Sequence, residues 1–250
     1  MKTLRALLTL VGFVFLTGGV GAAPNQSRIP GVIGPDDRQI IDTAEAPWVA
    51  IGRINVGGYR RTSHCTGTLI APRLVVTAAH CLADERTGEP VPVDRIHFLA
   101  GARRGDYQAH AKAACIRFHQ RYRPSGGSLT PQAAYDVAVI VLASEPAVEP
   151  VPLALTLRAS EGVRLIHAGY PRDRPYLLSA DGTCRLRGRK DGFWLTDCDS
   201  SFGDSGGPVL TQSDRGLVLA GIMIGFVPGK FSAVVPLSTW VGMTESDLCH

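Results

Sequence analysis

Beyond residue 23, the sequence contains no apolar run long enough to cross a bilayer, which requires about 20 residues. It also has no Cys-x-x-Cys pair with matching histidine spacing, no internal repeat and no low-complexity tract. These absences argue against a membrane-spanning domain in residues 24–250 and against a zinc site. No motif for a metal or an organic cofactor is present, so we expect none. The loop carboxylates of Asp84, Glu85 and Glu89 are interpreted as solvated charges rather than as a Ca²⁺ site.

The one long apolar stretch is N-terminal and has the pattern of a secretory signal peptide. Lys2 and Arg5 form a basic start, an apolar run covers residues 7–20, and small residues follow at 21–23. We predict that residues 1–23 are removed and that the protein is secreted or periplasmic, with no membrane attachment after removal. An uncleaved anchor is less favoured, because the run is short for a bilayer.

Little net charge remains once residues 1–23 are removed. The shortened chain holds 24 basic and 22 acidic residues, a formal charge of +2. We therefore expect no nucleic acid as a partner, and we interpret the basic residues between Arg185 and Lys190 as a solvated strand or loop. The sequence does not indicate an oligomeric state.

Six cysteines, an even number, occur in a chain that we expect to fold in an oxidising compartment. Three disulfides are therefore predicted, and the spacing alone leaves many pairings open. The cysteines are Cys65, Cys81, Cys115, Cys184, Cys198 and Cys249.

Short apolar bursts separated by 28 glycines and 17 prolines are typical of an all-β protein with many short strands. We predict a first series of strands at Trp48–Asn55, His64–Ile70, Arg73–Thr77, Arg95–Ala100, Ala109–Phe118 and Asp136–Leu142. A second series is predicted at Val163–Gly169, Thr183–Arg187, Gly207–Thr211, Leu217–Gly225 and Phe231–Val235, followed by a short C-terminal helix within Leu237–Leu248.

A stretch with three prolines, Ser144–Pro152, separates the two series. Proline fixes its own φ and keeps the preceding residue out of the helical region, so this stretch is predicted to be an extended connector. We place a domain boundary there, with a first domain over residues 32–145 and a second over residues 146–250. The polar residues 24–31 are expected to form a short pro-segment.

Three segments contain residue types suited to nucleophilic hydrolysis: Thr77–Cys81, Asp136–Leu142 and Gly203–Pro208. A serine hydroxyl attacks a carbonyl effectively only when a neighbouring base takes its proton. Histidine can do this near neutral pH, and a buried carboxylate can fix its orientation. His80, Asp136 and Ser205 are therefore the candidate catalytic residues.

The glycines beside the serine suit a second requirement of the same reaction. The oxyanion formed by the attack must be met by main-chain N–H groups already aimed at it, and glycine permits the necessary turn. The N–H groups of Gly203 and Ser205 are the candidates. Gly203–Gly207 also fits the Gly-x-Ser-x-Gly motif of α/β-hydrolases, but their order is Ser, acid, His, and a helix follows the serine. The order here is the reverse, and Pro208 begins an apolar strand-like run.

The three segments, in this order and with Cys81 directly after the histidine, resemble the trypsin/chymotrypsin family of serine proteases over about residues 32–245. The resemblance implies two six-stranded antiparallel β-barrels with the active site between them, histidine and aspartate from the first and serine from the second. It implies a serine endopeptidase that cleaves protein or peptide substrates through an acyl-enzyme. It also implies a Cys65–Cys81 disulfide and one from Cys184 to Cys198, which leaves Cys115 with Cys249.

A second resemblance concerns processing. Val32–Arg38 and Cys198-Asp199 resemble the bacterial glutamyl-endopeptidase-like branch, in which a valine near this position becomes the mature N-terminus. Cleavage before Ile29 would instead resemble trypsinogen activation, and signal removal alone is the third alternative. Family members with an aspartate at the position of Asp204 commonly pair it with the freed α-amino group, which predicts a zymogen. The alternative is that this carboxylate only hydrogen-bonds its own loop.

Specificity stays open between two interpretations of Asp199. It lies where trypsin-like enzymes carry the carboxylate that pairs with substrate Arg or Lys, and Ser200 adds to the likeness. However, Ser201 replaces a cysteine of that pattern. The usual Ser-Trp-Gly of the pocket wall is replaced by Ile224, Gly225 and Phe226, and the phenylalanine would narrow or block the slot. In the second interpretation, Asp199 is only a structural residue next to Cys198. The glutamyl branch places a histidine near Met223, so a preference for acidic side chains is also unsupported.

A catalytically inactive homologue that serves as a binding module is the alternative function. It is disfavoured because all three catalytic candidates and both loop glycines are present. An esterase would keep the same catalytic residues. The sequence does not separate a narrow processing protease from a broad digestive one.

Overall fold

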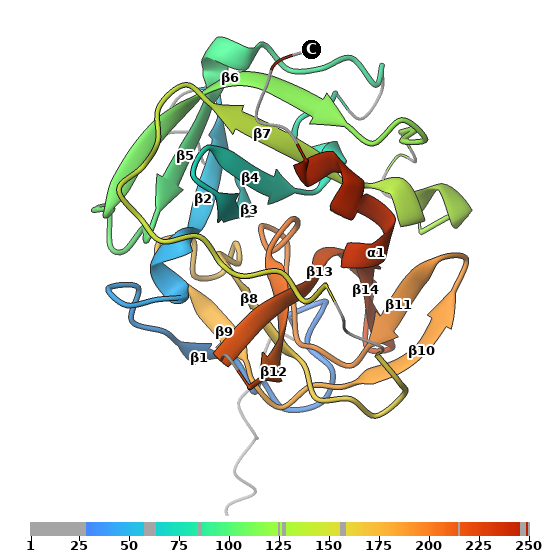
Figure 1. Ribbon diagram of the computed structural model, residues 1–250. Coiled ribbons are helices and arrows are strands. Elements are labelled where there is room, and N and C mark those ends of the chain that lie inside the picture. The colour runs from blue at the N-terminus through green and yellow to red at the C-terminus, as the bar shows by residue number, and fades with distance from the viewer. Residues whose placement is uncertain are drawn as a thin grey trace, which may run out of the picture.

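The computed structural model describes residues 29–57, 64–84, 87–124, 126, 129–155, 159–214, 216–245 and 249. Two groups of β-strands dominate it, one in the upper and one in the lower half of the view in Figure 1. The upper group is a closed antiparallel barrel in the order β2-β3-β4-β7-β6-β5. Its strands are β2 (Ile51–Val56), β3 (His64–Ala71), β4 (Leu74–Thr77), β5 (Ile96–Ala100), β6 (Ala109–Phe118) and β7 (Ala138–Leu142).

The burial of these strands follows their sequence pattern. Every residue of β4 and β7 is buried, and both are runs of β-branched and other apolar residues, which pack well on a pleated surface. In β6 the residues from His110 to Ala114 alternate between exposed and buried, as expected of a strand with one solvated face. The apolar faces meet in a core that extends to β12, β13 and β14 of the lower group.

The lower group is one sheet in the order β1-β9-β8-β12-β13-β14-β11-β10. Its strands are β1 (Gln39–Ile40), β8 (Ile166–Gly169), β9 (Ser179–Asp181), β10 (Leu186–Lys190), β11 (Phe193–Thr196), β12 (Pro208–Ser213), β13 (Gly216–Val227) and β14 (Phe231–Pro236). β9 and β10 follow each other in the chain, yet β9 pairs with β8 and β10 pairs with β11. A bridge between Arg164 and Arg185 continues the pairing between them, so the stretch 179–190 joins both sides of the sheet.

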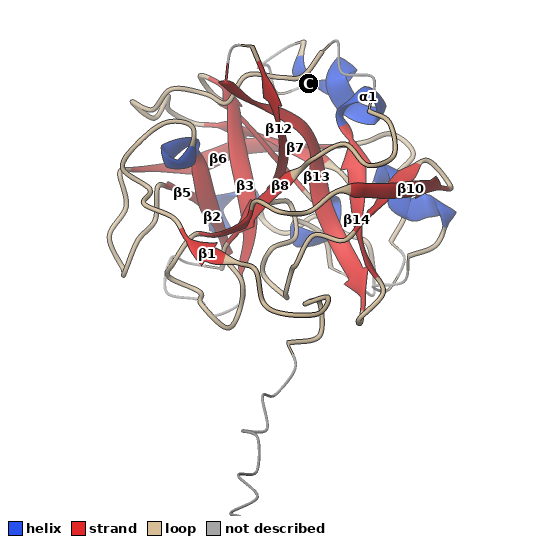
Figure 2. Ribbon diagram, turned by 90° about the horizontal axis from the view of Figure 1, so that it is seen from below, coloured by secondary structure: helices blue, strands red, loops and turns tan. Residues whose placement is uncertain are grey.

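Helical segments are short (Figure 2). The α-helix α1 (Leu237–Trp240) packs on β13 and β14, and its Trp240 is buried. The 3-10 helices are η1 (Trp48–Ala50), η2 (Ala79–Cys81), η3 (Val93–Arg95), η4 (Pro131–Tyr135) and η5 (Val241–Thr244). In the described part of the chain, none of the helices is long and apolar enough to span a bilayer.

All three disulfides are present, joining Cys65 to Cys81, Cys115 to Cys249 and Cys184 to Cys198. The first closes a loop of 16 residues in the upper barrel. The second, with a sequence separation of 134, ties the C-terminal end of the chain to β6 of the upper barrel. The third links the turn between β9 and β10 to the segment after β11.

The all-β fold, the six-stranded first barrel and the C-terminal helical segment are confirmed. The second group differs in detail from the expected six-stranded barrel, because it is one sheet of eight strands that includes the short β1 and β9. Other differences concern single elements. Trp48–Ala50 forms η1, so the first barrel strand begins at Ile51. The short strands β1, β9 and β11 were not predicted. The C-terminal segment is helical over residues 237–244, and residues 246–248 lie outside the described part.

The chain between the two groups contains no helix or strand over residues 143–152. Val151 N–H donates to Leu69 O in the upper barrel, and Ala154 N–H donates to Leu219 O in the lower sheet. The residues before the barrel, by contrast, contact the lower group, because β1 pairs with β9 and Ser200 N–H donates to Gly31 O. The domain limits at residues 32, 145 and 146 stay predictions.

Candidate active site

Strand pairing in the upper barrel brings His80 and Asp136 together. β4 and β7 are antiparallel neighbours with Thr77 opposite Ala138. Residues just after β4 and just before β7 must therefore meet at the same end of the barrel. His80 lies in η2, three residues after Thr77, and Asp136 follows η4, two residues before Ala138.

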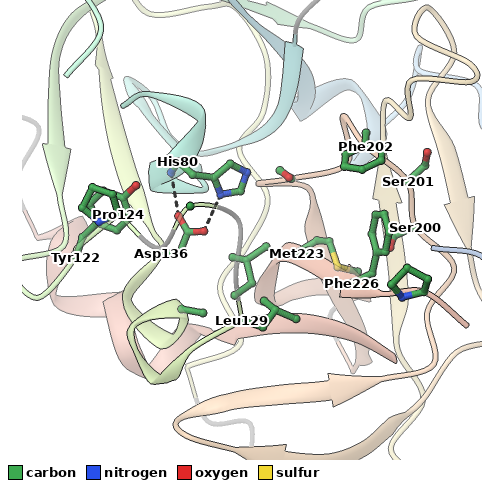
Figure 3. Close-up of a pocket in the computed structure, with 16 residues that line it drawn as sticks. His80, Tyr122, Pro124, Leu129, Asp136, Ser200, Ser201, Phe202, Met223 and Phe226 are labelled. Carbon is green, nitrogen blue, oxygen red and sulfur yellow. Dashed lines mark hydrogen bonds and ion pairs between the residues drawn. The ribbon is translucent and has the colours of Figure 1, made fainter. Parts of the chain in front are cut away.

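The carboxylate of Asp136 holds the histidine at two points. Its Oδ1 accepts the main-chain N–H of His80 at 2.9 Å, and its Oδ2 lies 2.6 Å from Nδ1 of the ring. Figure 3 shows both contacts as dashed lines. Since a carboxylate accepts hydrogen bonds, Nδ1 carries a proton, so in a neutral ring Nε2 is the basic nitrogen. Asp136 is 8% exposed, so water does not compete strongly for these contacts.

Ser205 lies in the loop between β11 and β12 and is tied to the upper barrel. Its carbonyl oxygen accepts the N–H of Thr66 in β3 at 2.9 Å, and Sγ of Cys81 lies 3.8 Å from the same oxygen. Because Cys81 directly follows His80, these contacts put the serine segment beside the histidine segment. A single pocket is lined by His80, Asp136 and Ser205. The structure thus brings the three predicted catalytic residues to one site.

The peptides Phe202–Gly203 and Asp204–Ser205 have N–H groups that are available to bind an oxyanion. Phe202 O accepts the N–H of Arg172 at 2.6 Å, and Asp204 O accepts the N–H of Gly207 at 2.8 Å. In a trans peptide the C=O and N–H point in opposite directions. The N–H groups of Gly203 and Ser205 therefore point away from these partners, and within the described part of the chain neither donates a hydrogen bond.

Glycine is required at two positions of this loop. Gly203 has φ +98°, and a side chain there would press on Tyr170 O and His64 Nε2. Gly206 has φ +80°, and a side chain there would overlap Thr77 and the main chain of the upper barrel. Both positions combine a left-handed backbone with close approach, which only glycine tolerates.

The pocket has a volume of about 340 Å³ and mostly apolar walls. Figure 3 shows His80 and Asp136 on one side, Phe202, Phe226 and Ser200 on the other, and Met223 and Leu129 between them. Of the predicted substrate-pocket residues, Ser200, Ile224, Gly225 and Phe226 line it. Phe226 stacks edge-on against Phe202 with ring centroids 5.4 Å apart.

Asp199 is not among the residues that line this pocket. Its Oδ1 accepts the N–H of Ile33 at 2.7 Å, and its Oδ2 accepts the N–H of Asp37 at 2.9 Å. Burial raises the pKa of Asp199 above its ordinary value, and the two N–H donors offset only part of this effect. The carboxylate therefore anchors the N-terminal arm, the residues from 29 to 41, and does not face the pocket.

A buried ionic cluster fixes the same arm. The side chain of Arg38 is 2% exposed and donates to Asp36 at 2.9 Å and to Asp173 at 3.0 Å. Hydrogen bonds from Arg38 lower the pKa of Asp36 despite its partial burial. Asp173 directly follows Arg172, whose N–H donates to Phe202 O. The cluster therefore stabilises the segment that holds the peptide between Phe202 and Gly203, whose N–H is an oxyanion-hole candidate.

These features agree with a comparison against family models. The model described as Trypsin matches residues 40–232, which is more than half of the chain. The chain belongs to the trypsin family.

Curated relatives of the chain share less than a third of their aligned residues with it. The chain is 28% identical over 189 residues to the glutamyl endopeptidase of Bacillus licheniformis, covering 74% of this chain and 56% of that protein. It is 25% identical over 219 residues to serine protease ea of Drosophila melanogaster, covering 66% of this chain and 53% of that protein. The chain thus spans about half the length of these curated relatives.

A solved structure shares the trypsin-family fold. The structure of a Glu endopeptidase in complex with MPD superposes with a TM-score of 0.65 and 21% identity, covering 86% of this chain and all of that one. At this identity the likeness supports the fold alone. The fold agrees with the two β-groups described above.

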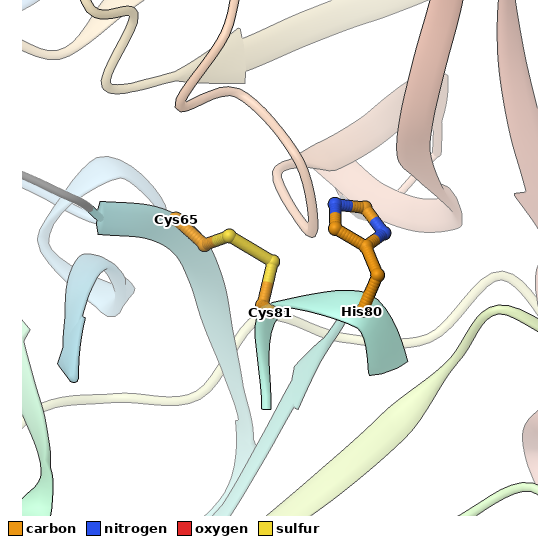
Figure 4. Close-up of side chains that lie close together, drawn as sticks. All are labelled: Cys65, His80 and Cys81. Carbon is orange, nitrogen blue, oxygen red and sulfur yellow. A yellow bond between two sulfur atoms is a disulfide. The ribbon is translucent and has the colours of Figure 1, made fainter. Parts of the chain in front are cut away.

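Cys65, His80 and Cys81 place one ligand-type atom each within 4.8 Å of one another, the spacing of a metal site. Figure 4 shows that the two sulfur atoms are bonded to each other. Metal binding by cysteine requires thiolates, which a disulfide does not offer. The bridge instead fixes η2, and with it His80, onto β3 of this trypsin-family barrel.

Several pocket residues were missed in the sequence. Tyr122, Leu129 and Phe202 line the pocket. Tyr122 and Leu129 lie in a loop with no motif around them, and Phe202 lies just before the Gly203–Pro208 segment. Their only sequence signal was an apolar or aromatic side chain between polar neighbours. His167 was also missed, although it is a buried histidine in β8.

Proposed function

We propose that the protein is a secreted serine endopeptidase of the trypsin family that hydrolyses peptide bonds through an acyl-enzyme on Ser205. The observation that supports this most is the pocket in which Asp136 holds Nδ1 of His80 and the ring shares the pocket with Ser205. Export rests on the signal-like residues 1–23, which lie outside the described part, and the three disulfides suit an oxidising compartment.

In the proposed reaction, Nε2 of His80 takes the hydroxyl proton of Ser205 as its oxygen attacks the substrate carbonyl. Asp136 stabilises the resulting imidazolium through Nδ1. The N–H groups of Gly203 and Ser205 meet the oxyanion. His80 then returns the proton to the leaving amine, and a water activated by the same ring hydrolyses the acyl-enzyme.

The pocket favours a large apolar side chain beside the scissile bond. Met223, Ile224 and Phe226 form apolar walls, and His80 is the only basic residue of the described chain that lines the pocket. This argues against an acidic side chain, which the name of the glutamyl endopeptidase relative would suggest. Asp199 is engaged by the arm, which argues against Arg or Lys.

Profiling a peptide library with the purified secreted protein tests the proposal. We expect cleavage next to large apolar residues, and a loss on the order of 10⁶-fold in kcat for Ser205→Ala. Ser213→Ala is the matched control, because Ser213 lies at the end of β12 and its hydroxyl bonds Gly216 O. Full cleavage by Ser205→Ala would exclude the mechanism. No cleavage by the folded wild type would favour the binding-module alternative, and turnover of esters alone would favour an esterase.

A further inference from the structure

The residue before the nucleophile, Asp204, is a buried carboxylate with an incomplete set of partners. It is 2% exposed, and its Oδ2 accepts the N–H of Ser201 in its own loop at 2.7 Å. Its Oδ1 has no hydrogen-bond partner in the described part of the chain. A buried carboxylate without a counter-charge is strongly unfavourable. The carboxylate therefore needs a cation or a proton.

His167 in β8 faces this carboxylate. It is 2% exposed, and its Nε2 lies 3.8 Å from Oδ2 of Asp204. Its Nδ1 lies 3.2 Å from Pro208 O, and a carbonyl oxygen can only accept, so Nδ1 carries a proton. Among the described residues, Nε2 has no hydrogen-bond partner. Without a proton its lone pair would point toward a carboxylate, so the pair is favourable only when it holds one further proton.

The other carboxylate near His167 is already satisfied. Asp181 lies directly opposite His167 in the β8–β9 pairing. It accepts the N–H and the hydroxyl of Thr183, both at 2.8 Å, and the N–H of Asp199 at 2.9 Å. No Lys or Arg of the described chain forms an ion pair with Asp181 or Asp204. Two carboxylates, and no Lys or Arg paired with either of them in the described chain, therefore lie on the His167 side of β8 and the catalytic loop.

β8 is in direct contact with the catalytic loop. A side chain on Gly169, two residues after His167, would overlap the carboxylate of Asp204. A side chain on Gly207 would lie 3.1 Å from the ring of His167. The imidazole therefore packs against the loop on both sides of Ser205.

We propose that His167, as an imidazolium, is the counter-ion of Asp204 and the positioning residue for the oxyanion N–H groups of Gly203 and Ser205. It does what a freed α-amino group would otherwise do, and no residue of the described arm donates a hydrogen bond to Asp204. In this arrangement the loop needs no activating cleavage to be ordered, and the zymogen predicted from the sequence stays the alternative. The proposal rests on the proposed function, since it concerns the same serine.

Kinetics of two single variants and their combination test this. His167→Leu should lower kcat about 100-fold, as expected for misplaced oxyanion donors, with KM changed less than about threefold. Adding Asp204→Asn removes the unpaired charge and should restore kcat at least about tenfold. His110→Leu is the matched control, because His110 lies on the exposed face of β6, and its kcat should equal that of the wild type. Thermal melting of each variant checks that it is folded.

A fall in kcat with little change in KM, together with its rescue by the second substitution, separates positioning from a merely structural role. Wild-type kcat should be unchanged after acetylation of the α-amino group, because the proposal assigns the charge opposite Asp204 to His167. This measurement on the wild type tests the proposal even if no variant folds.

Wild-type kcat in His167→Leu, or inactivation by acetylating the α-amino group, would overturn the proposal. If only this proposal fails, the wild type still reacts with a fluorophosphonate and cleaves peptides. If the wild type does neither, the proposed function itself fails.

Discussion

Replacing Asp136 by asparagine changes almost nothing in shape and one thing in chemistry. The amide oxygen can still accept the main-chain N–H of His80, which Oδ1 accepts at 2.9 Å. The amide nitrogen, however, then faces Nδ1 of the ring, where Oδ2 now lies 2.6 Å away. Since an amide N–H donates, the ring must present Nδ1 as an acceptor and carry its proton on Nε2. It can then no longer take a proton from Ser205.

We expect kcat to fall about 10⁴-fold, the magnitude known for loss of the correct tautomer in such a triad. At about 1.36 kcal/mol for each tenfold change, this corresponds to about 5.4 kcal/mol of transition-state stabilisation. KM should change little, because asparagine and aspartate have nearly the same shape, so the pocket keeps its form.

Steady-state hydrolysis of a peptide with a large apolar residue before the scissile bond measures the effect. Asp197→Asn is the matched control, because Asp197 also accepts one main-chain N–H, from Arg185, and pairs with one side chain, Arg187. Asp197 does not line the pocket. A kcat of the Asp136→Asn variant within tenfold of the wild type would refute the assigned role of the carboxylate.

Three further outcomes follow from the packing. Replacing Cys65 and Cys81 by alanine should lower the free energy of unfolding by about 3 kcal/mol in urea titrations, because the bridge closes a 16-residue loop. Arg38→Met should cost about 2 kcal/mol at neutral pH, since both carboxylate partners are partly exposed. Because the pKa of Asp36 is lowered in the folded protein, this carboxylate stabilises the fold at pH values above its ordinary pKa of 3.8. The cost of Arg38→Met should therefore shrink as the pH falls through the lowered pKa. Asp199→Ala should speed hydrogen exchange of the arm amides that it holds, measured by mass spectrometry.

The candidate catalytic residues could be predicted because their chemistry is local in sequence. His80, Asp136 and Ser205 each lie in a short segment whose neighbours are typical of one family. The pairing of β4 with β7 brings the first two together, and the contact between Thr66 and Ser205 O brings the third segment beside them. The longer strands were also predictable, since apolar β-branched runs such as β7 have no other favourable environment than a buried sheet.

The missed strands had weaker signals. β9 is only Ser179–Asp181, and two of its three residues are polar, so no apolar pattern marked it. β11 had a usable signal in Asp191-Gly192, whose φ values of 50° and 90° suit the two-residue turn between Lys190 and Phe193.

Side-chain direction was beyond the sequence. The position of Asp199 suggested a pocket carboxylate, but the arm from the other end of the chain supplies its two donors. His167 belongs to no motif, and its importance depends on burial and on one facing carboxylate. Both facts arise from contacts between distant segments.

Reaction of the folded protein with a fluorophosphonate, followed by peptide mapping in a mass spectrometer, tests the central claim most directly. We predict one covalent adduct, on the hydroxyl of Ser205, and no adduct in His80→Ala. No adduct in the folded wild type, or an adduct on a different serine, would contradict the proposed active site.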